Sequence, residues 1–124
     1  MQIHVTQQND AQVAVITTNE IMINDAQSAL DLLATVSYES GCNRMVLSKS
    51  AICEEFFDLK SGLAGEVLQK FVNYGVTLAI VGDFSAYSSS SLKDFMYESN
   101  KGNAVFFLST EKQALDKLST FGPV

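Results

Sequence analysis

The sequence predicts a single α/β domain over residues 1–124, with the element order β-β-α-β-α-β-α-β-α. Two features of the chain predict this fold. Short apolar runs alternate with segments whose apolar residues recur at helical spacing, which favours a mostly parallel sheet built from right-handed crossovers. The first two apolar runs are separated only by a turn, so we expect a mixed sheet that begins with an N-terminal hairpin.

Local patterns predict the hairpin and the first helix. Ile3 and Val5 alternate with polar residues, Asn9-Asp10 supply turn chemistry, and Val13–Thr17 is a β-branched run. Asn24 and Gln27 have the spacing of a capping box, so a helix is expected to begin there. Its apolar stripe consists of Ala26, Ala29, Leu30, Leu33 and Val36, and Gly41 is expected to end it.

Three more strands alternate with three more helices. Met45–Leu47, Val76–Val81 and Ala104–Leu108 are short apolar runs typical of buried strands. The first of these helices is expected to end at Gly75. The second is expected to start at the N-cap Ser91 and to end at Gly102, and the third to start at Thr110, with Gln113 in capping-box spacing. Their predicted core faces are Leu63, Ala64, Val67, Leu68, Phe71 and Val72, then Leu92, Phe95, Met96 and Ser99, then Ala114, Leu115 and Leu118.

Composition excludes several classes of function. Eight basic and fourteen acidic residues give a net charge of -6, which disfavours binding to nucleic acid or to an anionic membrane. Cys42 and Cys53 lack the spacing of zinc ligands, so two reduced thiols and no metal or other cofactor are expected. The chain has no signal-like start and no apolar run near the roughly 20 residues of a membrane span, so a cytoplasmic protein is expected.

The stretch FFDLKSGLAGEVLQKFVNYGVTLAIVGDFSAYSSSSLKDFMYESNKGNAVFF, from Phe56 to Phe107, is similar to a bacterial family called domain of unknown function 4180. The element order, with a glycine-led helix followed by a strand ending in Val81-Gly82, also resembles the sulfate-transporter and anti-sigma-factor-antagonist (STAS) fold over almost the whole chain. That resemblance implies a regulatory domain that binds a protein partner. In STAS antagonists, the loop before the second helix carries Asp-Ser-(Ser or Thr)-Gly, whose first serine is phosphorylated to switch binding to a partner kinase.

The corresponding segment of this chain, Asp58 to Gly62, is one residue longer than the STAS motif. Alignment on Gly62 places Lys60 at the phosphoacceptor position, and alignment on Asp58 places Leu59 there. Ser61 matches only the residue before the glycine. The resemblance therefore carries the phosphoswitch over to this chain only weakly.

The topology places the candidate site at the carboxyl ends of the parallel strands, where ligands and partners usually meet an open α/β sheet. Three polar segments are expected to converge there, namely Asp58 with Lys60 and Ser61, Asp83 with Ser85, and Ser109 with Thr110.

The carboxylates Asp58 and Asp83 have two interpretations. Together they offer oxygen ligands for a divalent cation, or an acid and base pair. Each also fits a turn cap, and this interpretation is favoured because no third ligand is evident. The amides that open the helix at Gly62, with Lys60, offer a weak anion site. His4, the only histidine, is expected on the surface of the hairpin without a nucleophile beside it, so no catalytic set is complete.

Two further groups of residues are open to a functional or a structural interpretation. Phe56, Phe57, Phe84 and Tyr87 either close the end of the core or form an exposed apolar patch that marks an interface. Glu98 and Asn100 either contact a partner or simply end their helix.

The leading hypothesis is a non-catalytic, STAS-like regulatory or protein-interaction domain. It would act through the loops Asp58–Gly62 and Asp83–Tyr87 and the exposed faces of the second and third helices, and a homodimer is also possible. The alternative is a protein that binds a small molecule or anion at the same edge, through Asp58, Lys60, Ser61 and Asp83. A polar pocket beneath Phe57 and Phe84 would support the ligand, and exposed rings would support the partner.

Overall fold

The computed structural model describes residues 1–120 as a five-stranded mixed sheet with four α-helices, in the order that the sequence predicts. The strands are β1 (Gln2–Gln8), β2 (Ala11–Thr17), β3 (Arg44–Ser48), β4 (Thr77–Val81) and β5 (Val105–Leu108). The helices are α1 (Ala26–Ser40), α2 (Leu63–Tyr74), α3 (Ser90–Lys101) and α4 (Glu111–Thr120).

The strands lie side by side in chain order, β1-β2-β3-β4-β5. β1 and β2 form the predicted antiparallel hairpin, and the other neighbouring strands are parallel. The hairpin turns at Asn9 and Asp10, whose φ values of 53° and 64° lie in the left-handed region. This is the geometry of a two-residue hairpin turn, and Asn and Asp tolerate it better than other non-glycine residues.

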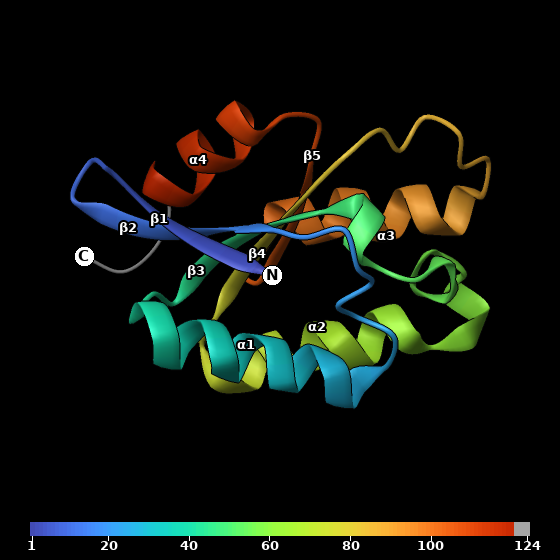
Figure 1. Ribbon diagram of the computed structural model, residues 1–124. Coiled ribbons are helices and arrows are strands. Elements are labelled where there is room, and N and C mark those ends of the chain that lie inside the picture. Colours follow the sequence, from blue (N-terminus) through green and yellow to red (C-terminus); the bar gives the residue numbers. More distant parts are fainter. Residues whose placement is uncertain (121–124) are drawn as a thin grey trace.

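The helices cover the two faces of the sheet unequally. α1, α2 and α3 lie on one face and α4 lies alone on the other (Figure 1). The alternation of side chains along each strand produces two cores, because successive residues point to opposite faces. Phe106 packs with Ala114 and Leu118 of α4, whereas Phe107 packs into the larger core beneath α3. The prediction that these two phenylalanines point to opposite faces is confirmed.

Two predicted helix starts are wrong by one or two residues. The N-cap of α1 is Asp25, whose carboxylate accepts the Ser28 N–H, so the capping box is shifted by one residue from Asn24 and Gln27. The N-cap of α3 is Ser89, whose hydroxyl accepts the Leu92 N–H. The run of four serines offers several equivalent caps, and Ser89 is the one that lets Leu92 and Met96 face the core.

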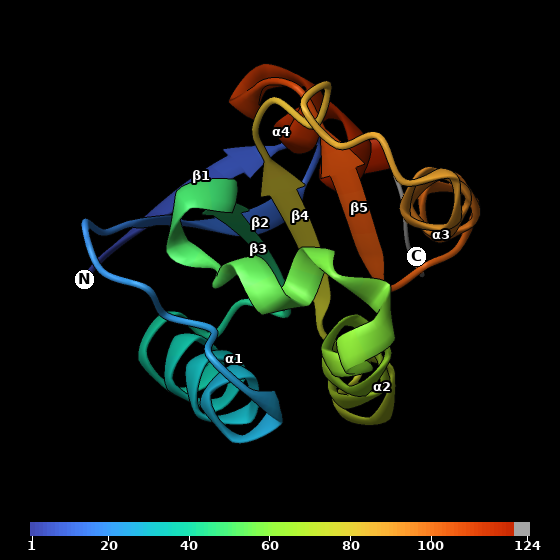
Figure 2. The same ribbon diagram turned by 90° about the vertical axis from the view of Figure 1, so that its right-hand side faces the viewer.

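The predicted core face of α2 is correct except at Val72, which is 54% exposed. Leu63, Ala64, Val67 and Phe71 are buried. Val72 lies on the flank that faces α3, and the two helices are set apart there (Figure 2).

The segment between β3 and α2 consists of three 3-10 turns at Lys49–Ala51, Glu54–Phe57 and Leu59–Ser61. The isolated bridge between Ile23 and Ile52 ties this segment to the chain before α1. The segment therefore has a defined shape and carries its side chains across the carboxyl ends of the strands.

Candidate functional site

The parallel strands end at one edge of the sheet, as predicted from the topology. Ser48 of β3 lies beside Val81 of β4, and Val81 lies beside Leu108 of β5. Figure 2 shows β4 and β5 reaching this edge together. A shallow pocket of about 490 Å³ opens there, which we call the C-edge pocket. It is lined by Ile21, Ser48, Lys49, Ser50, Ile52, Cys53, Glu54, Gly82 and Asp83.

Lys49 is held at the wall of this pocket by its neighbours. The Ser48 hydroxyl accepts the Ser50 N–H at 3.3 Å, which fixes the turn that carries Lys49. Gly82 lies against the lysine stem, because a Cβ at this position would be 2.6 Å from the Lys49 Cβ. The Lys49 Nζ lies 4.9 Å from the ring centre of Tyr87, a distance typical of a cation–π contact. Glycine at position 82 therefore leaves the space in which Lys49 crosses to the aromatic ring.

Tyr87, whose ring Lys49 contacts, is also bonded to Glu54, a residue of the pocket lining. The Tyr87 hydroxyl donates a hydrogen bond to Glu54 Oε2 at 3.2 Å. Partial burial is the main cause that raises the pKa of Tyr87, and its contact with Lys49 opposes the shift. The tyrosine therefore stays protonated at neutral pH and can donate this hydrogen bond.

Asp83 contributes an ionised carboxylate to the C-edge pocket. Hydrogen bonds from the Ser85 hydroxyl and from its backbone N–H, the latter at 2.9 Å, lower the pKa of Asp83, and the positive charge of Lys49 adds to this shift. Asp83 and Ser85 thus form a turn of the kind that the structural interpretation predicted. The pocket presents Lys49 together with two carboxylates, Glu54 and Asp83.

The aromatic residues close the end of the core. Phe56 and Phe57 are 1% and 5% exposed, and their rings meet edge to face at 4.9 Å between centres. Phe57 also stacks on Tyr87 at 5.1 Å, and Phe84 meets Phe107 at 5.6 Å. Phe84 and Tyr87 are partly buried. The four rings therefore do not form an exposed patch, and the C-edge pocket lies beside them.

Asp58, Lys60 and Ser61 do not line the C-edge pocket, which Asp83 lines. Asp58 accepts the Lys60 N–H at 3.2 Å. The Ser61 hydroxyl contacts the carbonyl oxygens of Glu55 and Asp58 at 2.7 and 2.8 Å. The side chains of Asp58 and Ser61 thus stabilise a turn on the exposed side of the segment. The 3-10 turns carry the chain past the pocket before α2 begins.

Ser109 and Thr110 likewise lie outside the C-edge pocket. The Thr110 hydroxyl accepts the Gln113 N–H at 3.1 Å, and Gln113 Oε1 accepts the Ser109 N–H at 3.0 Å. The predicted cap of α4 is therefore confirmed, and both residues are used to start this helix.

A second hollow, which we call the α2–α3 groove, has a volume of about 290 Å³. It is lined by Leu68, Val72, Phe95, Glu98, Ser99, Gly102, Asn103, Ala104 and Val105. Val72, which lines the groove, is 54% exposed. The groove is thus mainly apolar, and part of its apolar lining is exposed.

The family model named domain of unknown function (DUF4180) matches residues 8–118. The chain belongs to the DUF4180 family. No curated protein and no solved structure matches the chain. In this DUF4180 chain, the matched range includes every residue of the C-edge pocket and of the α2–α3 groove, whereas β1 lies outside it except for Gln8.

Glu98 and Asn100 of the DUF4180 chain have different roles. Glu98 lines the α2–α3 groove and pairs with Lys101 at 3.8 Å, with both side chains largely exposed. Asn100 instead binds the backbone of Phe107, so its side chain is occupied inside the domain. Of these two residues, Glu98 has the exposed side chain, whereas that of Asn100 is used within the domain.

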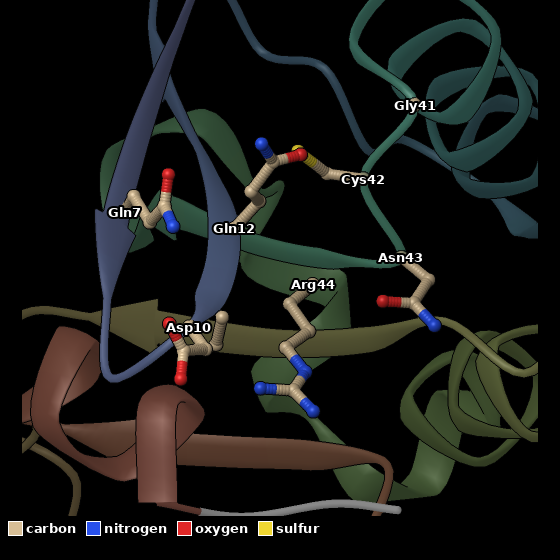
Figure 3. A pocket seen from close by; sticks show the side chains of 8 residues that line it. Gln7, Asp10, Gln12, Gly41, Cys42, Asn43 and Arg44 are labelled. Atoms are coloured by element: carbon tan, nitrogen blue, oxygen red, sulfur yellow. The ribbon is translucent and has the colours of Figure 1, made fainter. Parts of the chain in front are cut away.

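A third hollow, the hairpin pocket, lies at the opposite end of the parallel strands from the C-edge pocket and has a volume of about 330 Å³. Gln7, Gln12 and Arg44 surround it, together with the loop after α1 (Figure 3). Arg44 is the only arginine of the chain, and its Nη1 donates to the Leu118 carbonyl at 2.7 Å. This bond ties β3 to α4, which gives Arg44 a structural role.

Lys49 and Glu54 are the site residues that the sequence analysis missed. For Lys49 the signal was present, because Lys49-Ser50 follows β3 just as Gly82-Asp83 follows β4. Within residues 1–120, no three His, Cys, Asp or Glu side chains gather closely enough to hold a metal ion. In the same range, no helix has both the length and the apolar character to cross a membrane.

Proposed function

We propose that this DUF4180 chain is a non-catalytic regulatory domain of the bacterial cytoplasm, with a STAS-like architecture, that acts by binding a protein partner. The hairpin followed by three crossovers supports the STAS-like assignment, because these elements occur in the order that the resemblance implies. The α2–α3 groove is the observation that carries the interaction proposal.

The groove has the composition of a partner-binding surface. Leu68 and Val72 contribute apolar side chains from α2, and Phe95 contributes one from α3. Val72 is 54% exposed, so part of this apolar lining reaches the surface. Exposed apolar surface of this kind marks interaction sites on soluble proteins.

The shape of the groove favours one kind of partner segment. A hollow between two helices accepts the apolar face of an amphipathic helix, whose side chains at positions i and i+4 lie along it. The pair between Glu98 and Lys101 provides polar contacts beside the apolar lining. The partner is therefore a protein with an amphipathic helix that inserts one or two large apolar side chains.

The two loops named from the sequence support the same arrangement. Asp58–Gly62 leads into α2 and Asp83–Tyr87 lies shortly before α3, so both precede the helices that form the groove. Lys60 and Ser85 are exposed in these loops. A partner lying along α2 and α3 contacts these polar residues at one end and the groove farther along the helices.

Affinity purification from the native host tests this proposal. The bait is the wild-type chain, the variant Val72→Asp, or the control Tyr38→Asp, whose residue is 91% exposed on α1. We expect one protein to be recovered with the wild type and the control and to be lost with Val72→Asp. Recovery of no specific protein, or equal recovery with Val72→Asp, would count against the groove as the binding surface.

The C-edge pocket favours a second candidate function, the binding of a small polar molecule. Lys49, Glu54 and Asp83 line it together, so it offers both signs of charge to a ligand. A thermal-shift screen of phosphates, carboxylates and amino acids at about 10 mM tests this candidate, since a ligand bound to the folded chain raises its Tm. The rise should be lost in Lys49→Gln and retained in Val72→Asp. If no compound raises the Tm, this candidate function is excluded and the groove proposal is unaffected.

A further inference from the structure

The two outer strands of the sheet, β1 and β5, differ in how other parts of the chain cover them. β5, at one edge, is only four residues long. Side chains of α3 bind its outward backbone groups: Asn100 binds the N–H and C=O of Phe107, and the Ser99 hydroxyl binds the C=O of Val105. This edge is therefore closed to a further strand.

β1, at the other edge, has none of these protections. It is seven residues long, and its sequence QIHVTQQ contains no proline and no Asp, Glu, Lys or Arg. Within residues 1–120, no strand pairs with its outer side (Figure 2). Natural proteins shield exposed edges with short strands, charges, prolines or covering elements, because an open edge is a template for another strand.

The register of the hairpin identifies the free backbone groups of β1. Gln8 and Ala11 flank the two-residue turn and therefore form a hydrogen-bonded pair. Such pairs alternate along an antiparallel ladder, so Ile3, Val5 and Gln7 direct their N–H and C=O groups away from β2. Val5 stands in the middle of these three residues, and its side chain is 43% exposed.

We propose that two copies of this chain associate through antiparallel pairing of their β1 strands, with the two-fold axis at Val5. In this register Val5 pairs with Val5 of the second copy, and Ile3 pairs with its Gln7. About six backbone hydrogen bonds form, since each such pair exchanges two. The two five-stranded sheets then join into one continuous sheet.

The chemistry of β1 favours a second copy as the occupant of this edge. A chain with net charge -6 repels itself on average, but β1 brings no charged side chain to the two-fold axis. Ile3, Val5 and Gln7 lie on the face of α1, because they oppose Ile16, Ala14 and Gln12. Met1 is 47% exposed, so Met1 and Val5 add apolar surface at the start of the strand. This association is independent of the α2–α3 groove.

Sedimentation and light scattering of the full chain over a range of concentrations test this pairing. The wild type should have twice the monomer mass, and Val5→Lys should halve it, because two ammonium groups would meet at the axis. Val5→Pro should also give monomers, since it removes an outward N–H and leaves the ladder to β2 intact. Tyr38→Lys, on α1, is the charge-matched control and should stay dimeric. Circular dichroism should show that each variant remains folded.

A cysteine variant tests the register directly and does not depend on disrupting the strand. Residues opposed in a hydrogen-bonded pair have Cα atoms about 5.5 Å apart, a distance within the range that disulfides span. Under mild oxidation, Val5→Cys should form a covalent dimer on a non-reducing gel, whereas Tyr38→Cys and the wild type, with Cys42 and Cys53, should not. A wild type that stays monomeric at about millimolar concentration, a dimer that survives Val5→Lys and Val5→Pro, or pairing of β1 only with a different protein would overturn the proposal.

Discussion

The side chain of Asn100 makes two hydrogen bonds with the backbone of Phe107, donating from Nδ2 to the carbonyl oxygen at 3.1 Å and accepting from the N–H at Oδ1 at 2.7 Å. The amide thus replaces a neighbouring strand at the β5 edge. Because Phe107 is 5% exposed, its backbone groups have little access to water as an alternative partner.

Asn100→Ala is therefore expected to lower the free energy of unfolding by about 1–3 kcal/mol, the usual cost of leaving buried polar groups unsatisfied. Urea unfolding measures this change. The control is Asn103→Ala, whose residue is exposed, and its effect should stay within about 0.5 kcal/mol. Equal effects of the two substitutions would show that the bonds to Phe107 are not stabilising.

Two glycines allow the same substitution to act in opposite directions. Gly82→Ala places a Cβ 2.6 Å from the Lys49 Cβ, and we expect a loss of about 1–3 kcal/mol from overpacking. Gly65→Ala in α2 meets no atom within 4 Å and should stabilise by about 0.5–1 kcal/mol, since alanine favours a helix over glycine. Urea midpoints of the two variants measure the difference. A tolerated Gly82→Ala would mean that Lys49 is free to move away from Gly82.

The aromatic residues of the segment before α2 are predicted to behave as core. Phe57→Ala should lower the free energy of unfolding by about 3–5 kcal/mol, because the ring is 5% exposed and contacts three other rings. Lys60→Ala, three residues later and exposed, should change it by less than about 0.5 kcal/mol. Thermal or urea unfolding compares the two. A small effect of Phe57→Ala would indicate that the ring leaves the core easily.

The N-cap of α1 should make stability depend on pH in the acid range. Hydrogen bonds from the backbone N–H and the hydroxyl of Ser28 lower the pKa of Asp25 below its usual 3.8. A carboxylate with a lowered folded-state pKa stabilises the fold above the unfolded value, and this stabilisation is lost as the pH falls through the folded value. Asp25→Ala should therefore lower the urea midpoint at pH 7 and have a smaller effect at about pH 2.5. The same loss at both pH values would contradict this role for the ionised carboxylate.

The sequence predicted the fold because strands and helices leave local periodic patterns. All five strands and four helices were expected, and Gly41 and Gly75 end their helices in the left-handed conformation. The errors have physical causes. Asp25 and Ser89 replace the expected caps by shifts of one and two residues, because neighbouring polar residues cap equally well in isolation and packing chooses among them.

The candidate site was harder to predict, because its residues come from segments that only the tertiary fold brings together. Asp83 was found because Gly82-Asp83 follows a strand. Lys49 follows a strand too, but its position depends on Gly82 and on the ring of Tyr87, both distant in sequence. The burial of Phe57 depends on 3-10 turns that have no clear sequence period. Val72 belongs to a core face by its helical spacing, yet the groove leaves it exposed.

Site-specific photo-crosslinking in the native host tests the interaction proposal most directly. Glu98, which lines the α2–α3 groove, is replaced by a benzophenone-bearing phenylalanine, and the same replacement at Tyr38 on α1 serves as the control, since both side chains are exposed. The account predicts that irradiation yields one specific adduct with another protein from position 98, that position 38 gives none, and that Val72→Asp abolishes the adduct. The absence of any adduct at position 98, or the same adducts from both positions, would contradict it.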